Sequence, residues 1–175
     1  MSAEDYLSLG ETEPRCELIN GVVVMSPSPR PRHAKVILEL AMQLGNFAAS
    51  GGSVDAYTET DLQINDLAVF RPDICAYANA PGKIPERLTV APDLVVEVLS
   101  PGSETLDFIT KRDEYERRGV KEYWVIDPAD ARVRAWRLVR GRLIEALVEG
   151  DSFASTGIPG FDLDIARIRA IVTAS

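Results

Sequence analysis

The chain has 175 residues, of which 46% are apolar and 26% are charged, a composition typical of a globular protein. Its length predicts one domain, residues 1–175, and no apolar stretch is long enough for a membrane-spanning helix. The net charge of −8 argues against a basic coat protein for nucleic acids. Two distant cysteines and one histidine exclude zinc knuckles, redox pairs and multi-histidine metal sites. The N-terminus lacks a secretory signal, so we expect a cytoplasmic protein.

The N-terminal half of the sequence predicts helices separated by short strands. Ser2 and Asp5 have the spacing of a capping box at the start of a helix. Asn20-Gly21 separates two apolar segments and is typical of a tight β-hairpin turn. A Pro-rich loop over residues 26–31 precedes a helical pattern that Gly51-Gly52 ends. We therefore expect, in chain order, a helix over 2–9, strands over 15–19 and 22–25, a helix before residue 51, and strands over 54–64 and 69–77, with Asp66 in the turn between them and Asp73 on the last.

The C-terminal half predicts a further alternation of strands and helices. A loop rich in Pro and Gly, residues 80–92, leads into an apolar strand. Ser103 could cap the helix that follows, and Gly119 ends it. The expected elements are a strand over 94–99, a helix over 103–118, a strand over 122–126, a hairpin over 132–148 that turns at Arg140-Gly141, and a closing helix over 165–172. This order predicts an α/β (α+β) fold in which a mixed sheet is flanked by helices.

Glu97 most needs an explanation, because it interrupts the apolar strand over residues 94–99. A lone carboxylate in a buried strand is costly unless something compensates it. Strand alternation puts Glu97 on one face and leaves the opposite face wholly apolar. Three charged residues could take part in the compensation. Asp73 lies 24 residues upstream, Lys111 lies 14 residues downstream, and Glu17 interrupts a strand of the hairpin.

Lys111 lies in the helix after this strand, where Asp107 and Tyr115 are its i−4 and i+4 neighbours on the same face. Because a helix can fold back beside the strand it follows, Lys111 can approach Glu97. Hydrolysis of a phosphodiester with a divalent ion needs at least two carboxylates and a lysine. Oxygen ligands suit Mg²⁺ or Mn²⁺. The sequence motifs of nucleotide hydrolases and esterases are absent. These residues therefore predict a metal-dependent phosphodiesterase centre.

Around these positions the sequence resembles the PD-(D/E)XK, or restriction-endonuclease-like, nucleases, and within them the Uma-two family of bacterial proteins. The resemblance covers nearly the whole chain. The matching stretches are Glu17-Leu18-Ile19-Asn20-Gly21, Met25-Ser26-Pro27-Ser28-Pro29, His33, Arg71-Pro72-Asp73-Ile74, residues 92–101 around Glu97, Lys111, residues 119–128, and Ile158-Pro159-Gly160-Phe161.

The resemblance implies a restriction-endonuclease-like core sheet between helices, preceded by the N-terminal hairpin. It implies that Asp73 and Glu97 are metal ligands and that the backbone carbonyl of Val98 is a third. The lysine of the superfamily normally lies two residues beyond this Glu, where Leu99 stands here; Lys111 in the next helix is the replacement candidate. Glu17 matches an acid near the start of the fold that holds the metal through water or completes a second site.

The implied activity is that of an endonuclease that needs Mg²⁺ or Mn²⁺ and hydrolyses phosphodiester bonds of nucleic acid, with DNA as the favoured substrate. A homodimer is expected, because small nucleases of this type often use two sites to cut two strands. The alternative function is a catalytically silent nuclease-fold module that binds nucleic acid or protein. The acidic net charge supports that alternative.

Each site residue also has a purely structural interpretation. Asp73 could cap a turn, and Glu97 could be a buried salt-bridge partner of Arg71 or Lys111. Glu17 and Lys111, each taken alone, are typical of solvated surface residues. Their joint occurrence in the order of the family favours the metal site.

Neighbouring residues have two interpretations as well. His33 begins a helix, where a surface position is favoured over contact with a phosphate or support of the site. Ser100 either assists the site through a hydrogen bond or begins a turn with Pro101. Tyr115 and Trp124 are expected to pack in the core, with stacking on bases as the alternative.

Charge is distributed unevenly along the chain. Residues 1–110 carry 7 Lys/Arg against 16 Asp/Glu, residues 111–142 carry 10 against 6, and residues 143–175 carry 2 against 5. The basic residues of the middle block could contact phosphates, but the favoured interpretation is a solvated face or partners for acidic residues. They include Arg132, Arg134, Arg137, Arg140 and Arg142.

Overall fold

A computed structural model describes residues 1–10, 14–26, 28–79 and 84–174. Both expected Pro-rich loops include residues outside this set, residue 27 in one and residues 80–83 in the other. The elements are α1 (Ala3–Ser8), β1 (Cys16–Ile19), β2 (Val22–Met25), α2 (Pro31–Ala49), β3 (Asp55–Thr58), β4 (Leu62–Asn65), β5 (Ala68–Phe70), β6 (Ile74–Tyr77), β7 (Leu94–Val98), η1 (Leu106–Lys111), α3 (Arg112–Arg118), β8 (Glu122–Asp127), β9 (Arg132–Val139), β10 (Arg142–Ala146), β11 (Ser152–Ala154), β12 (Asp162–Asp164) and α4 (Ile165–Thr173).

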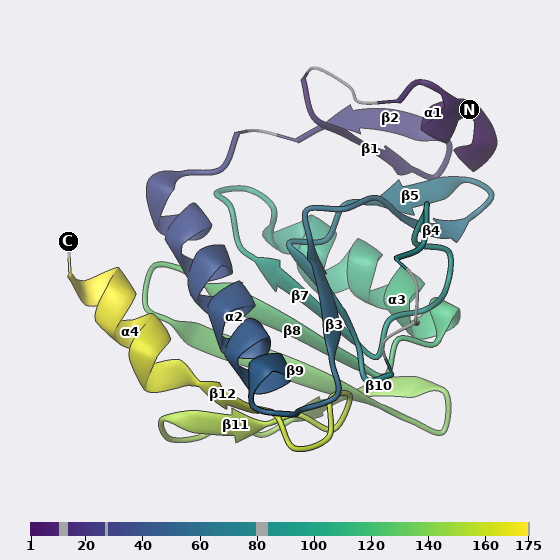
Figure 1. The fold of residues 1–175 in the computed structure, drawn as a ribbon. Helices are drawn as coiled ribbons and strands as arrows, with labels where there is room; N and C mark the ends of the chain where they lie inside the picture. The colour runs from purple at the N-terminus through teal and green to yellow at the C-terminus, as the bar shows by residue number, and fades with distance from the viewer. Residues whose placement is uncertain (11–13, 27, 80–83, 175) are drawn as a thin grey trace.

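The largest sheet has six strands in the order β10-β9-β8-β7-β6-β3. Within it β7 and β8 run parallel, with Glu97 opposite Val125, and the other adjacent pairs are antiparallel. A second sheet has four strands in the order β2-β1-β5-β4, and β11 pairs with β12. Figure 1 shows the four-stranded sheet at one end of the six-stranded sheet. The mixed α+β architecture predicted from the order of elements is confirmed.

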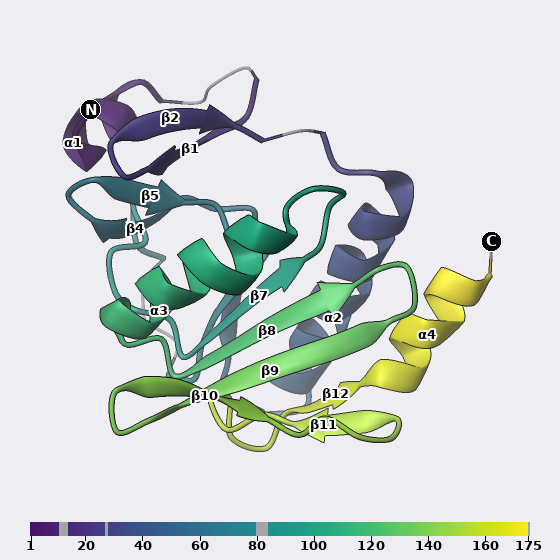
Figure 2. The same cartoon turned by 180° about the vertical axis from the view of Figure 1, so that it is seen from behind.

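Helices cover both faces of the six-stranded sheet. α2 and α4 lie on one face, and η1 and α3 lie on the other, as Figures 1 and 2 show from opposite sides. Leu94 and Val96 belong to the core on the α2 side, whereas Val95 and Leu99 belong to the core that contains Tyr115 of α3. The alternation expected along this strand is confirmed, so the acid of β7 shares its face with α3.

Local sequence signals account for the N-terminal elements. The Ser2 hydroxyl accepts a hydrogen bond from the Asp5 backbone N–H at 3.1 Å, and the Asp5 carboxylate accepts one from the Ser2 backbone N–H at 3.3 Å. This reciprocal pair is the predicted capping box. Asn20 and Gly21 have φ angles of 50° and 77°, the left-handed values that a two-residue hairpin turn requires. α2 begins at Pro31, a residue favoured in the first turn of a helix.

The helix expected over residues 103–118 is present, and its first part is widened. The Asp107 N–H donates to the Ser103 carbonyl at 2.9 Å, which agrees with a helix that starts after Ser103. The segment η1 is π-helical before α3 continues to Gly119, whose φ of 86° ends the helix. Such π-turns occur frequently at functional sites. Among the described helices, none is long and apolar enough to cross a membrane.

Two strand predictions need correction. The strand expected over residues 54–64 is divided into β3 and β4, because Glu59 has a left-handed φ of 48° that no strand accommodates. The strand expected over residues 69–77 is divided into β5 and β6 at Pro72, which has no N–H to donate to a neighbouring strand. Asp73 therefore precedes β6 instead of lying on it. β11 and β12 were not predicted, because three residues are too few to show alternation.

Candidate active site

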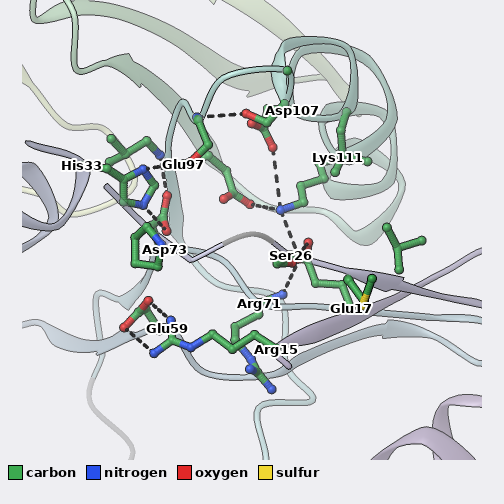
Figure 3. A pocket seen from close by; sticks show the side chains of 18 of the residues that line it. Arg15, Glu17, Ser26, His33, Glu59, Arg71, Asp73, Glu97, Asp107 and Lys111 are labelled. Atoms are coloured by element: carbon green, nitrogen blue, oxygen red, sulfur yellow. Dashed lines mark hydrogen bonds and ion pairs between the residues drawn. The ribbon is translucent and has the colours of Figure 1, made fainter. Parts of the chain in front are cut away.

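A pocket of about 270 Å³ opens where several segments meet. Its walls come from the C-terminal end of β7, the first turn of α2, the end of β2, the loop over residues 100–103 and η1. Glu17, Asp73, Glu97 and Lys111 all line it, as Figure 3 shows. The four residues singled out in the sequence therefore lie around one cavity, although they come from separate segments of the chain.

Lys111 lies among three carboxylates. Its Nζ is 3.0 Å from Oε1 of Glu17, 3.1 Å from Oε1 of Glu97 and 3.7 Å from Oδ1 of Asp107 (Figure 3). All four residues are buried, Lys111 and Glu97 being only 4% exposed. Glu17 and Lys111 therefore do not occupy the surface positions that are typical of such residues taken alone. The ammonium group instead compensates a concentration of negative charge inside the protein.

The helix that carries Lys111 also holds Glu97 in place. Asp107 and Lys111 belong to η1, and Tyr115 lies one turn further on in α3, as the i±4 spacing predicted. The Tyr115 hydroxyl donates a hydrogen bond to Oε1 of Glu97 at 2.8 Å. The Lys111 ammonium donates to the same oxygen. Glu97 is therefore oriented by two donors from one helix.

Asp73 is fixed at the end of β7. Its Oδ2 accepts a hydrogen bond from the Val98 backbone N–H at 2.6 Å, and its Oδ1 is 3.2 Å from Nε2 of His33. Nδ1 of His33 is in turn 3.3 Å from the Ser100 hydroxyl. Asp73, Glu97 and Val98, the residues expected to supply the metal ligands, all line the pocket.

Glu17 joins the hairpin to the pocket. Its Oε1 accepts a hydrogen bond from the Arg71 backbone N–H at 2.7 Å, in addition to its ion pair with Lys111. Its Oε2 accepts one from the Ser26 hydroxyl at 3.4 Å. Glu17 thereby connects β1, the segment before Asp73 and the helix of Lys111.

The pKa values follow from burial and from this crowding of charges. Burial raises the pKa of Glu97 well above its usual value; Lys111 opposes the shift, and the neighbouring carboxylates reinforce it. Burial lowers the pKa of Lys111, but the carboxylates around it, Glu97 first, outweigh burial and raise the pKa above its usual value. Burial also raises the pKa of Asp107 against the opposing effect of Lys111. Burial lowers the pKa of His33, but the hydrogen bond to Asp73 contributes to a net rise.

The donor set fits a small divalent cation. The expected ligand groups are carboxylate and carbonyl oxygens, the hard ligands that Mg²⁺ and Mn²⁺ prefer. Because burial holds the pKa of Glu97 above its usual value even beside Lys111, a bound cation would favour the ionised carboxylate. Within the described part of the chain, no group of three or more His, Cys, Asp or Glu side chains is arranged to hold a metal ion. An ion here would be held by Asp73 and Glu97, with backbone and water oxygens completing its ligands.

Several structural interpretations can now be compared with the contacts. The salt bridge between Glu97 and Lys111 is present, whereas Arg71 directs its Nε to Asp61 at 2.8 Å. The surface position favoured for His33 is wrong, since this residue is only 7% exposed.

The other interpretations concern packing and surface charge. Tyr115 and Trp124 are buried in the core as expected, although Tyr115 also serves the site. Ser100 contacts the site through its hydroxyl and precedes the turn that begins at Pro101. Most arginines of the basic block contact acidic residues, as the favoured interpretation predicted; these pairs are Arg132 with Asp127 and Asp130, Arg134 with Glu145, Arg137 with Glu122, and Arg142 with Glu116.

Two features of the pocket were not assigned from the sequence. Asp107 is 4% exposed and contributes to the charge cluster, and its i−4 spacing from Lys111 was the available signal. Arg15 and Glu59 form an ion pair on the pocket wall. They are 44 residues apart, and no local pattern indicates their contact.

Comparison with known proteins identifies the fold and then the family. The crystal structure of "a putative nuclease belonging to DUF820 from Anabaena variabilis ATCC 29413" has the same fold. Its TM-score is 0.80, over 98% of this chain and 99% of that chain, at 22% sequence identity. The model of the Uma2 family, described as "Putative restriction endonuclease", matches residues 3–166. The chain belongs to the Uma2 family, which confirms the resemblance found in the sequence. No curated protein matches it.

Proposed function

We propose that the protein is an endonuclease that hydrolyses phosphodiester bonds of nucleic acid with the help of Mg²⁺ or Mn²⁺, with DNA as the favoured substrate. The observation that carries the proposal is the meeting of Glu17, Asp73, Glu97 and Lys111 at one pocket, with Lys111 within 3.1 Å of two of the acids. Membership of the Uma2 family supports a nuclease.

Each residue has a role that its contacts support. Asp73 and Glu97 would hold the ion together with the Val98 carbonyl. When bound, the ion stabilises the negative charge that develops on the phosphate during cleavage. Lys111 would orient the attacking water by hydrogen bonding, and its own position depends on Glu17 and Asp107. The water oxygen forms a new bond to phosphorus as one ester P–O bond breaks, and water supplies the proton that the leaving oxygen requires.

The alternative is a catalytically silent module that binds nucleic acid or protein. One observation favours it: Lys111 already pairs with Glu97, so the site is partly compensated without a cation. The net charge of −8 also disfavours tight binding to a polyanion. The homodimer and the cytoplasmic location stay predictions.

Cleavage distinguishes the two functions. Purified protein is incubated with supercoiled plasmid, single-stranded DNA and RNA in the presence of Mg²⁺ or Mn²⁺, beside Asp73→Ala and Glu97→Ala preparations. We expect cleavage by the wild type alone. If all three preparations are inactive while the wild type binds nucleic acid, the silent module is supported. Equal cleavage by all three would identify a contaminant and remove the assignment of both acids.

A further inference from the structure

The ion pair between Arg15 and Glu59 lies on the wall of the pocket, on the Asp73 side (Figure 3). Both terminal nitrogens of the Arg15 guanidinium contact the Glu59 carboxylate, one to each oxygen, and the bond from Nη2 to Oε2 measures 3.3 Å. The two side chains are 45% and 34% exposed. This pair is therefore accessible to a ligand that enters the pocket.

Arg15 differs from the other basic residues on the described pocket wall. The side chain of Lys111 is 5% exposed, that of His33 is 9% exposed and that of Arg71 is 18% exposed. Each of these three contacts a carboxylate that is itself largely covered. Of the basic side chains on the described pocket wall, Arg15 is thus the most exposed, and an anionic substrate can contact it without any rearrangement of buried ion pairs.

The backbone holds the pair close to the expected metal ligand. The Glu59 N–H donates a hydrogen bond to the Asp73 carbonyl at 3.2 Å, and Glu59 has a left-handed φ of 48°, which is uncommon for a residue with a side chain. Such conformations cluster at ligand-binding sites. On the other side, the Ser26 N–H donates to the Arg15 carbonyl at 2.8 Å. The backbones of both partners are therefore held at the pocket by hydrogen bonds to neighbouring segments.

A guanidinium fork binds a carboxylate and a phosphate with the same planar, two-bond geometry. We propose that Arg15 binds a phosphate group of the substrate strand, next to the phosphate group at which the strand is cleaved. The Glu59 carboxylate occupies this phosphate subsite until the strand binds. This proposal rests on the proposed function. Glu59 then acts as a built-in competitor. The two partners must have opposite effects on binding, which an ion pair that only stabilises the fold does not produce.

Binding of nucleic acid without cleavage tests the subsite. Fluorescein-labelled single-stranded and duplex DNA of one sequence are titrated with protein in EDTA, and fluorescence anisotropy is followed at several salt concentrations. Arg15→Gln should weaken binding about tenfold, the loss of one charge-assisted contact. It should also reduce the slope of log affinity against log salt by about 0.7 to 0.9. Glu59→Gln should tighten binding, because it removes both the competitor and a repelling charge.

The pair Arg134 and Glu145 provides a matched control. It is also a forked pair, made through Nε and Nη2 of Arg134, and its exposure is similar, 42% and 50%, but it lies on the β9–β10 hairpin away from the pocket. Arg134→Gln and Glu145→Gln should leave the affinity within twofold of the wild type. The melting temperature of each variant shows that it is folded.

The outcomes separate the subsite from the proposed function. If Arg15→Gln and Glu59→Gln both weaken binding, or neither changes it, while Asp73→Ala abolishes cleavage, the subsite is wrong and the nuclease stands. An equal loss of affinity in Arg134→Gln would also overturn the subsite, because any exposed arginine would then contribute equally to binding of nucleic acid. A wild type that neither binds nor cuts any nucleic acid would overturn both proposals.

Discussion

Replacement of Lys111 by Met tests whether the charge cluster is as interdependent as its geometry indicates. The substitution keeps an unbranched apolar stem but removes the ammonium from within 3.0 to 3.7 Å of three buried carboxylates. Removing one partner of a buried ion pair costs about 3–5 kcal/mol, because the remaining charge loses its compensation. For a chain of this length, each kcal/mol lowers the melting temperature by about 2–4 °C. We therefore expect Lys111→Met to melt about 6–20 °C lower than the wild type in the absence of metal.

Urea unfolding at neutral pH measures this loss. The double variant Lys111→Met with Glu97→Gln should be more stable than the sum of the two single changes, with a coupling of about 0.5–3 kcal/mol, because the residues are in direct contact. A loss below about 1 kcal/mol in Lys111→Met, or strict additivity in the double variant, would refute the assignment of Lys111 as the compensating charge.

The remaining predictions concern pH, packing and metal. The pKa of Glu97 is raised in the folded protein, so its protonated form stabilises the metal-free fold. This contribution is fully present below pH about 4.5 and is lost as the pH rises through the folded pKa. The stability of Glu97→Gln relative to wild type should therefore increase with pH in urea unfolding curves. Gly157→Ala should lose about 1–3 kcal/mol of unfolding free energy, because its Cβ would lie 2.3 Å from the Asp93 carbonyl oxygen. Its control, Gly45→Ala in α2, meets nothing within 4 Å and should gain about 0.5–1 kcal/mol. Millimolar Mg²⁺ or Mn²⁺ should raise the melting temperature of the wild type in a thermal-shift assay, and Glu97→Gln should abolish the increase.

Contrary results would be informative for each of these. A stability difference between Glu97→Gln and wild type that is constant with pH would show that Glu97 titrates normally. A Gly157→Ala variant as stable as the wild type would show that the loop after β11 moves easily away from the Asp93 carbonyl. An unchanged metal-induced rise in Glu97→Gln would remove Glu97 from the metal site.

Much of the fold follows from short-range signals in the sequence. The capping box at Ser2, the hairpin turn at Asn20-Gly21 and the helix stop at Gly119 each depend on residues that are adjacent or nearly so, and each is present. The division of the strand expected over residues 54–64 could not be derived in the same way. It depends on the left-handed conformation of Glu59, whose backbone is tied to Asp73 across the fold.

The site shows the same limit. A buried acid in an apolar strand indicated Glu97, and helical spacing indicated that Lys111 and its neighbours share a face; these contacts are present. The role of His33 at Asp73 was not predicted, because a residue at the start of a helix gives no sign of which strand end it will reach. The contact of Arg15 with Glu59 likewise depends on how the four-stranded sheet sits against the end of the larger one.

The most direct test of the central claim is the initial rate of cleavage as a function of Mn²⁺ concentration, for the wild type and for Glu97→Gln, on the substrate that the wild type cuts. We predict a saturable dependence on Mn²⁺ for the wild type and no rate in EDTA. The variant should require a much higher Mn²⁺ concentration and reach a lower maximal rate, because one of the two proposed carboxylate ligands has become an amide. Identical curves for the two proteins, or cleavage that persists in EDTA, would contradict a metal-dependent nuclease centred on Asp73 and Glu97.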